Sequence, residues 1–216
     1  MKLDKKIITV LILAILFGSV GGYLSIRNKY FYEGKRVWIS QASKNYDTSN
    51  PEIAVNISDY VFVAKVNKIL RTEYRNPVEV EIGIGQSVIQ KDPYTIYEIE
   101  VVENLKGNLK TNEPIEFVQY GGINEDGKSY SLLADSSFLN VGDYYLLMVG
   151  VIPDTLEIEI SDNNRMICLG KDLVKAENMI NTYKGLISNE VNEWNEMKNK
   201  SISKFDMNYK KDELEK

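Results

Sequence analysis

The chain has 216 residues, a formal net charge of −5 and no histidine. Its length suits one domain plus a membrane segment, and 44% hydrophobic with 26% charged residues is typical of a folded protein. The acidic balance argues against a nucleic-acid partner, and the absence of histidine excludes imidazole catalysis and histidine-dependent metal sites. The only cysteine, Cys168, excludes an intramolecular disulfide and is expected to be a small buried residue.

The amino terminus, residues 1–27, is predicted to be a signal-anchor. Lysines precede an uncharged apolar run at residues 7–17, and the apolar character continues to Ile26. As a helix, about 20 residues reach about 30 Å, the thickness of a bilayer core. The short basic lead favours a single-pass membrane protein whose carboxyl-terminal domain is extracytoplasmic. Small residues at 19–21 leave cleavage open, and cleavage would make the protein secreted.

Residues 28–50 are expected to form a polar and aromatic stalk, and residues 51–170 a mainly β domain. Strand-like runs, rich in β-branched and aromatic residues, occur at 60–69, 78–84, 97–101, 115–120, 144–149, 156–160 and 165–169. Turns and not helices separate them, which predicts an antiparallel barrel or sandwich.

Three of these runs allow finer predictions. Alternation with glutamates predicts a half-buried strand at 78–84. A change of phase at Val101-Val102 predicts a bulge. Residues 144–149 are apolar throughout, which predicts a strand covered on both faces.

Residues 171–199 are predicted to form an amphipathic helix, or two helices broken at Gly185. The apolar positions recur at gaps of three and four, at Leu173, Ala176, Ile180, Tyr183, Ile187, Val191 and Trp194. Such a stripe usually faces its own core, so we expect it to cover the open side of the barrel, with a partner-binding helix as the alternative. The charged tail, residues 200–216, is expected to be frayed.

An acidic loop at Asn124, Glu125 and Asp126 is the one weak candidate for a metal site, through oxygen ligands to calcium. Two carboxylates are too few for an EF-hand, so a hairpin turn ending at Gly127 is the preferred interpretation. The run Asp162-Asn163-Asn164 is interpreted as a turn in the same way. No cofactor is expected.

Catalytic candidates are few. Ser136 and Ser137 follow Asp135, but without histidine only a lysine base could activate a serine, and no spacing indicates one. Glutamate pairs occur on two strands, Glu98 with Glu100 and Glu157 with Glu159. Paired carboxylates hydrolyse glycosides when they face each other across a cleft, whereas glutamates on alternating strands usually form a solvated face. No catalytic residue is assigned, and an enzyme is not expected.

Three runs resemble a loose bacterial group related to the netrin and tissue-inhibitor-of-metalloproteinase modules. They are the strand at 58–66, the run at 97–107 that ends in Lys106-Gly107, and the run at 141–148, which contains Gly142-Asp143-Tyr144-Tyr145-Leu146. The resemblance implies a five-stranded OB-type barrel with a helix against it. It carries no inhibitor function over, because the family's amino-terminal zinc-binding cysteine and its disulfides are missing.

The sequence therefore favours a non-enzymatic binding module at the outer face of the membrane. Its expected contacts are the membrane, through the amino-terminal helix, and an envelope protein, a peptide or a wall polymer. The 14 tyrosines are compatible with carbohydrate or peptide contacts on the face of a barrel. The alternative is an extracytoplasmic hydrolase that uses paired carboxylates.

Overall fold

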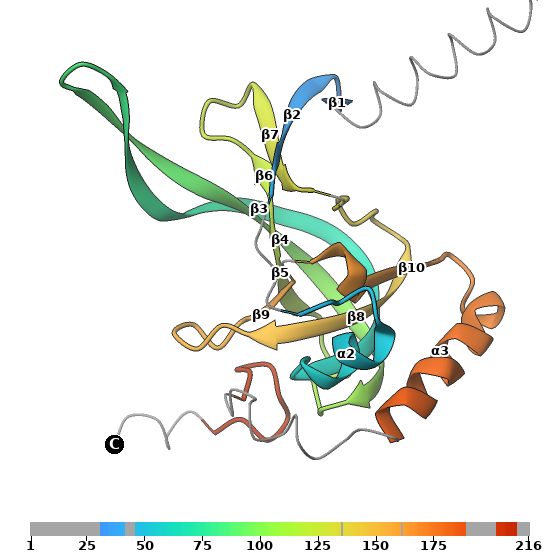
Figure 1. Ribbon diagram of the computed structural model, residues 1–216. Coiled ribbons are helices and arrows are strands. Elements are labelled where there is room, and N and C mark those ends of the chain that lie inside the picture. The colour runs from blue at the N-terminus through green and yellow to red at the C-terminus, as the bar shows by residue number, and fades with distance from the viewer. Residues whose placement is uncertain (1–30, 42–45, 135, 161, 189–201, 211–216) are drawn as a thin grey trace, which may run out of the picture.

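The computed structural model describes residues 31–41, 46–134, 136–160, 162–188 and 202–210 (Figure 1). In this part of the chain the protein is mostly β, with two sheets and few helices. The membrane segment expected at residues 1–27 lies outside it. None of the helices that the structure describes is both long enough and apolar enough to span a bilayer.

The larger sheet has six strands in the order β10-β8-β3-β4-β5-β9. Their bounds are β3 Tyr60–Gly83, β4 Gln86–Lys106, β5 Ile115–Tyr120, β8 Tyr144–Val151, β9 Ile158–Ile160 and β10 Met166–Gly170. Most pairs are antiparallel, as predicted. Strand β9 pairs in parallel with β5 and antiparallel with β8, so the pairings β8–β3–β4–β5–β9 lead back to β8.

Strand β8 is buried on both faces, which confirms the prediction for its apolar run. Tyr145 and Leu147 belong to the main core, where they join the fully buried Phe117 of β5. Leu146 and Met148 point to the opposite side and pack with the helices. The predicted bulge is also present, because Ala64 pairs with Val101 whereas the preceding Val63 pairs with Glu103, which leaves Val102 without a partner in the ladder.

A smaller sheet has the order β1-β2-β7-β6, with β1 at Phe31–Tyr32, β2 at Lys35–Ser40, β7 at Ser129–Leu133 and β6 at Gly122–Ile123. Strand β2 runs parallel to β7, with Val37 opposite Tyr130. Residues 31–40 were expected to belong to a stalk, and they are instead part of this sheet. The pairing joins segments about 90 residues apart, and a short strand with basic residues gives little local signal of such a partner.

Two α-helices lie together against the larger sheet. Helix α2, Pro51–Asn56, was not predicted, although Asn50 at its N-cap, Pro51 and Glu52 are a typical helix start. Helix α3, Leu173–Ser188, passes Gly185 without a break. Its buried Ala176 and Ile180 pack on Val63 of β3, so the stripe covers the protein's own sheet, as expected. Val191 and Trp194 lie outside the described residues.

Part of the carboxyl-terminal tail packs on the core, contrary to the expected fraying. In residues 202–210, Ser203 and Asp206 are buried. Asp206 pairs with Leu109 in an isolated bridge. The Tyr60 hydroxyl donates to Asp206 Oδ2 at 2.8 Å and accepts from the Ser203 amide at 3.1 Å. Specific hydrogen bonds of this kind leave no periodic signal in the sequence, which explains the wrong expectation.

The end of the β3–β4 hairpin, residues 76–90, projects from the sheet as a two-stranded arm (Figure 1). Every residue of the arm is exposed. Residues 78–83 of the predicted run are therefore a strand, whereas Ile84 lies in the turn, and the strand is not half-buried. Alternation indicates that one face is apolar, and it cannot indicate what covers that face.

Candidate binding site

An open cleft of about 530 Å³ lies between the two sheets. It is lined by Tyr32, Val37, Ile39, Leu132, Ala134, Ser136, Ser137, Phe138, Asn140, Tyr145, Asn163, Met166 and Cys168. The described lining combines apolar and aromatic side chains with neutral hydroxyl, amide and thiol groups and holds no Asp, Glu, Lys or Arg. A cleft of this size and composition suits an uncharged or weakly polar ligand.

Two aromatic rings, Tyr32 and Phe138, line the cleft, and Tyr130, which is not a lining residue, packs against both of them. The ring centroid of Tyr32 lies 5.0 Å from that of Tyr130 and 4.7 Å from that of Phe138, and Tyr130 and Phe138 are 5.6 Å apart. The Tyr130 hydroxyl donates to Glu33 at 2.7 Å, which fixes the outer ring to the β1–β2 turn. Three rings in mutual contact hold one another in place, so the aromatic side of the cleft is preformed.

The loop that carries Ser137 and Asn140 is held in place by hydrogen bonds that involve the buried Tyr97 and Tyr145. Tyr97 donates to Gln119 Oε1 at 3.0 Å, and Gln119 Nε2 donates to the Ser137 carbonyl at 2.8 Å. The Asn140 amide donates to the Tyr145 hydroxyl at 2.9 Å. Burial raises the pKa of Tyr145 to about 12, so its hydroxyl is neutral in the cleft at ordinary pH. These bonds position the loop that carries Ser136 and Ser137.

Cys168 is exposed, contrary to the expectation of a buried cysteine. It lies on β10, an edge strand of the larger sheet, and its side chain lines the cleft. The neighbouring Ile167 and Leu169 point the other way and pack with the helices. The alternation along β10 therefore places the thiol at the cleft. The apolar run alone does not reveal which of its residues face outward.

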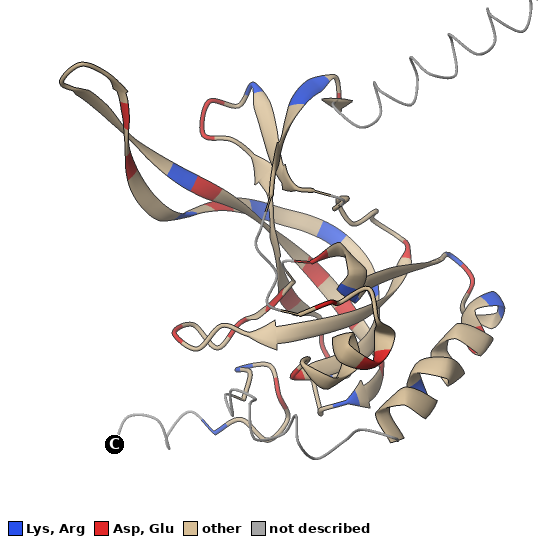
Figure 2. Cartoon of the chain, in the orientation of Figure 1, with Lys and Arg blue, Asp and Glu red and all other residues tan. Residues whose placement is uncertain are grey.

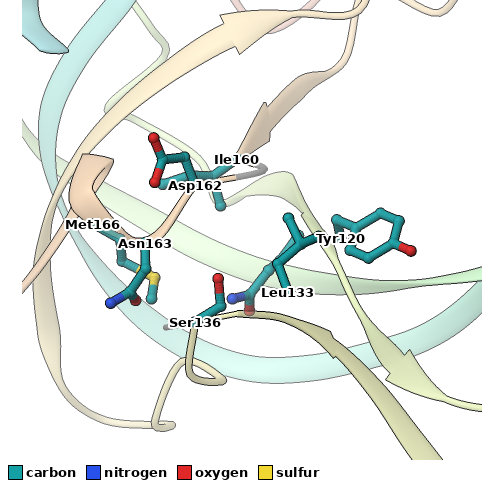
Figure 3. A pocket seen from close by; sticks show the side chains of 8 residues that line it. Tyr120, Leu133, Ser136, Ile160, Asp162, Asn163 and Met166 are labelled. Atoms are coloured by element: carbon teal, nitrogen blue, oxygen red, sulfur yellow. The ribbon is translucent and has the colours of Figure 1, made fainter. Parts of the chain in front are cut away.

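A second, much smaller cavity adjoins the cleft (Figure 3). It shares Ser136, Asn163 and Met166 with the cleft lining, and Gln119, Tyr120, Leu133, Ile160 and Asp162 complete its wall. Its volume of about 10 Å³ is close to the space that one water molecule requires. The small cavity therefore has no room for an organic ligand, and the larger cleft is the candidate site.

The serines of the predicted nucleophile motif reach the cleft. Both Ser136 and Ser137 line it. Asp135 lies outside the described residues. Serine chemistry without histidine requires a lysine, and the described lining of the cleft includes none. Within the described lining, the two serines offer hydroxyl groups that can donate and accept hydrogen bonds.

The glutamates of the predicted carboxylate pairs are placed away from the cleft. Glu98 forms an ion pair with Lys68 at 3.1 Å, and Glu100 is exposed. Glu157 is buried, contrary to the expected solvated face, and lies 2.9 Å from Arg75 and 3.1 Å from Lys204.

The pairs around Glu157 continue into a network of alternating charge along β3. Arg75 also contacts Glu73 at 2.5 Å, Glu73 contacts Arg71 at 2.7 Å, and Arg71 donates to both carboxylate oxygens of Glu116 at 2.9 Å. Hydrogen bonds from Arg71 lower the pKa of Glu116. Burial raises the pKa of Glu159, and the nearby Arg75 opposes this shift. The arrangement binds strands together, and no carboxylate is among the described residues that line the cleft.

The weak metal candidates form a hairpin turn between β6 and β7, as preferred. The Gly127 amide donates to the Asn124 carbonyl at 2.8 Å. The Asn124 side chain bonds Ser129 and Ser131, and Glu125 pairs with Lys91 at 3.0 Å. Asp126 Oδ1 accepts the Lys128 amide. Within the described residues, no three acidic or cysteine side chains are grouped as metal ligands.

The run at Asp162 is more than a plain turn. Asp162 accepts from the Asn164 amide at 3.1 Å and begins a short 3₁₀ helix, η1 (Asn163–Arg165). It also accepts from the Thr48 hydroxyl. These bonds tie the segment before α2 to the cleft, because Asn163 is a lining residue.

Two comparisons with known proteins complete the description of the site. No family model matches the chain, and a search of curated proteins finds no match.

Proposed function

We propose that the protein is a non-enzymatic binding module, anchored in the membrane by its amino-terminal segment with the domain on the extracytoplasmic side. The observation that carries the proposal is the cleft of about 530 Å³ between the two sheets, which lies within the range of ligand sites in proteins. Its aromatic side supplies contact area, and Ser136, Ser137 and Asn140 supply neutral hydrogen-bonding groups.

The ligand that suits this cleft best is an uncharged stretch of an extended peptide, such as a segment of an envelope protein. Met166 and Cys168 bring alternate side chains of the edge strand β10 into the cleft. A peptide lying along such an edge places every second side chain on the same side. The neutral lining favours apolar and hydroxyl side chains over charged ones.

The architecture we propose for the larger sheet is an OB-like barrel related to the netrin and tissue-inhibitor group. Its support is the order of pairing, in which β3, β4 and β5 follow one another and β9 joins β5 to β8. The five-stranded OB barrel binds ligands with a sheet face and adjoining loops. Lys106, at the end of the matching run, lies beside α2, where its Nζ donates to the Val55 carbonyl at 2.9 Å.

A hydrolase with paired carboxylates has weaker support. Glycosidic chemistry needs two carboxyl groups about 5 to 10 Å apart across a substrate site. Glu157 lies between Arg75 and Lys204, and Glu98 is paired with Lys68. None of these glutamates lines the cleft. Their ion pairs favour a structural role.

The proposal is tested by panning the full chain, held in lipid nanodiscs, with displayed random linear peptides. Ser137→Trp fills the cleft from an exposed loop position, and Val141→Trp places the same ring on an exposed site outside the lining. We expect enriched peptides to bind at least about tenfold more weakly to Ser137→Trp, because the ring occupies their space, and to bind Val141→Trp normally.

Soluble wall glycan fragments form a second arm of the same experiment. If a glycan is retained and Ser137→Trp abolishes its retention, the protein is still a binding module, but its ligand is a glycan and not a peptide. Failure of both peptides and glycans to bind, or binding that ignores Ser137→Trp, would contradict the cleft as a binding site.

A further inference from the structure

The tip of the β3–β4 arm is apolar in a place where soluble proteins are usually polar. Ile84, at the turn, is 104% exposed, and Ile82 is 62% exposed. Gly83 and Gly85 flank Ile84, and Gly85 has a φ of +70°, which allows a tight turn without a polar turn residue. An exposed apolar tip of this kind marks a surface that is covered in the working protein.

The apolar residues continue from the tip along one face of the arm. Val80 pairs with Val88, and Val78 shares their face because it is two residues from Val80. On the other face Glu79 pairs with Ile89, and Glu81 pairs with Ser87. Residues 82–90 contain no charged side chain (Figure 2). These residues form the turn and the returning strand of the arm, and Glu79 and Glu81 lie opposite that strand, so both strands are free of charge only beyond the Glu81–Ser87 pair.

The arm and the start of the described chain project beyond the same end of the larger sheet. In Figure 1 the arm, β1 and β2 lie in the upper part of the view. Helix α3 and residues 202–210 lie in the lower part. Only residues 27–30 separate Ile26, the last apolar residue of the predicted anchor, from Phe31 of β1. At full extension this link reaches about 18 Å. An anchored domain is therefore held with β1, and the side that carries the arm, near the bilayer.

The small sheet has side chains that suit this position. Phe31 and Trp38 are about half exposed, and the Arg36 guanidinium stacks on the Trp38 ring at 4.0 Å. Phe31 pairs with Arg36, so all three share one face of the sheet. Tryptophan and arginine are favoured at the level of lipid headgroups, where an apolar ring and a charge are both solvated.

We propose that the tip of the β3–β4 arm, around Ile82 and Ile84, enters the outer surface of the lipid bilayer in which the amino-terminal segment is anchored. The inference rests on the proposed anchor. Glu81 pairs with Ser87 and is set back from the turn, and its side chain lies on the opposite face of the strand from Ile82. Ile82 and Ile84 can therefore reach the acyl boundary while the Glu81 carboxylate remains at the headgroups. The domain then has two lipid contacts, which fixes its orientation and the direction in which the cleft opens.

A second copy of the chain is the main alternative occupant. A docking surface for a protein needs one apolar face, and the arm has such a face in Val78, Val80 and Val88. The end of the arm is apolar around the turn as well, and a flat protein surface would leave Ile84 uncovered. A fluid lipid surface covers an end from all sides, which is why the observations favour lipid.

The test uses an environment-sensitive fluorophore on single cysteines in the full chain. With Cys168→Ser as background, Ile84→Cys is labelled and the chain is reconstituted into phosphatidylcholine vesicles, with and without lipids that carry a quencher on the acyl chain. Val174→Cys on α3, which is 81% exposed, is the matched control. We expect a blue-shifted emission at position 84 and quenching about threefold or more stronger than at position 174.

Equal quenching at positions 84 and 174 would overturn the inference. A blue shift at position 84 without quenching by lipid would also overturn it, and would indicate a second copy as the occupant. A label at Ala14→Cys reports the anchor separately. Quenching at position 14 without quenching at position 84 would support the anchor and contradict the arm contact. No quenching at either position would contradict both.

Discussion

Replacement of Phe117 by alanine is expected to lower the free energy of unfolding by about 3–5 kcal/mol. Phe117 is fully buried on β5, and its ring lies 6.4 Å from that of Tyr97 in the main core. Alanine removes a large apolar surface and leaves a cavity among strands whose backbones are fixed by pairing on both sides. Neighbouring groups cannot easily move in to fill such a cavity, so the loss of unfolding free energy is expected near the upper end of this range.

Urea unfolding of the full chain in nanodiscs, followed by circular dichroism, measures this change. Phe31→Ala is the matched control, because it removes the same ring from a half-exposed position. We expect the control to change the unfolding free energy by less than about 1 kcal/mol. A Phe117→Ala variant no less stable than the Phe31→Ala variant would contradict the described core.

Gly107→Ala is expected to lower the free energy of unfolding by about 2–4 kcal/mol. Gly107 has a φ of +85°, and a Cβ atom there would lie 2.2 Å from Cδ1 of the Tyr60 ring. That ring is buried, and its hydroxyl holds Asp206 and Ser203. The variant must therefore strain the turn and displace the ring that secures residues 202–210.

Gly142→Ala separates the two effects. Gly142 has a φ of +89°, but a Cβ atom there meets nothing within 4 Å. Its variant carries the backbone strain alone and is expected to lose about 1 kcal/mol. Proteolysis near residues 202–210 should accelerate only in Gly107→Ala. Equal stability and equal proteolysis of the two variants would show that the contact with Tyr60 is unimportant.

Gly107 also illustrates what the sequence can and cannot reveal. The Lys106-Gly107 pair was recognised as the end of a strand. Its physical basis, room for the Tyr60 ring beside a positive φ, depends on a residue 47 positions earlier in the chain. The strand-like run at 115–120 likewise predicted β5 with its observed bounds, and the change of phase at Val101-Val102 predicted the bulge at Val102. Local periodicity determines such features, so they are readable without a structure.

The candidate site was much less predictable. Its lining residues come from β1, β2, β7, the loop before β8, β8, η1 and β10, which are spread along the chain. The segment at 31–40 was expected to be a stalk because its partner, β7, had no recognised strand signal. Cys168 was expected to be buried because an apolar run does not show which side faces a cleft. Pairings between strands that are distant in sequence decide whether residues 31–40 join a sheet and which way Cys168 faces. These pairings follow from the packing of the whole chain.

The location of the domain is the central claim, and labelling of Cys168 tests it most directly. This residue is the chain's only cysteine and is exposed. The measurement is the reaction of a membrane-impermeant maleimide with the full chain in wall-free cells, before and after permeabilisation, with Cys168→Ser as the blank. Our account predicts equal labelling in both conditions, with the protein in the membrane fraction. Labelling that requires permeabilisation would place the domain in the cytoplasm and contradict the account.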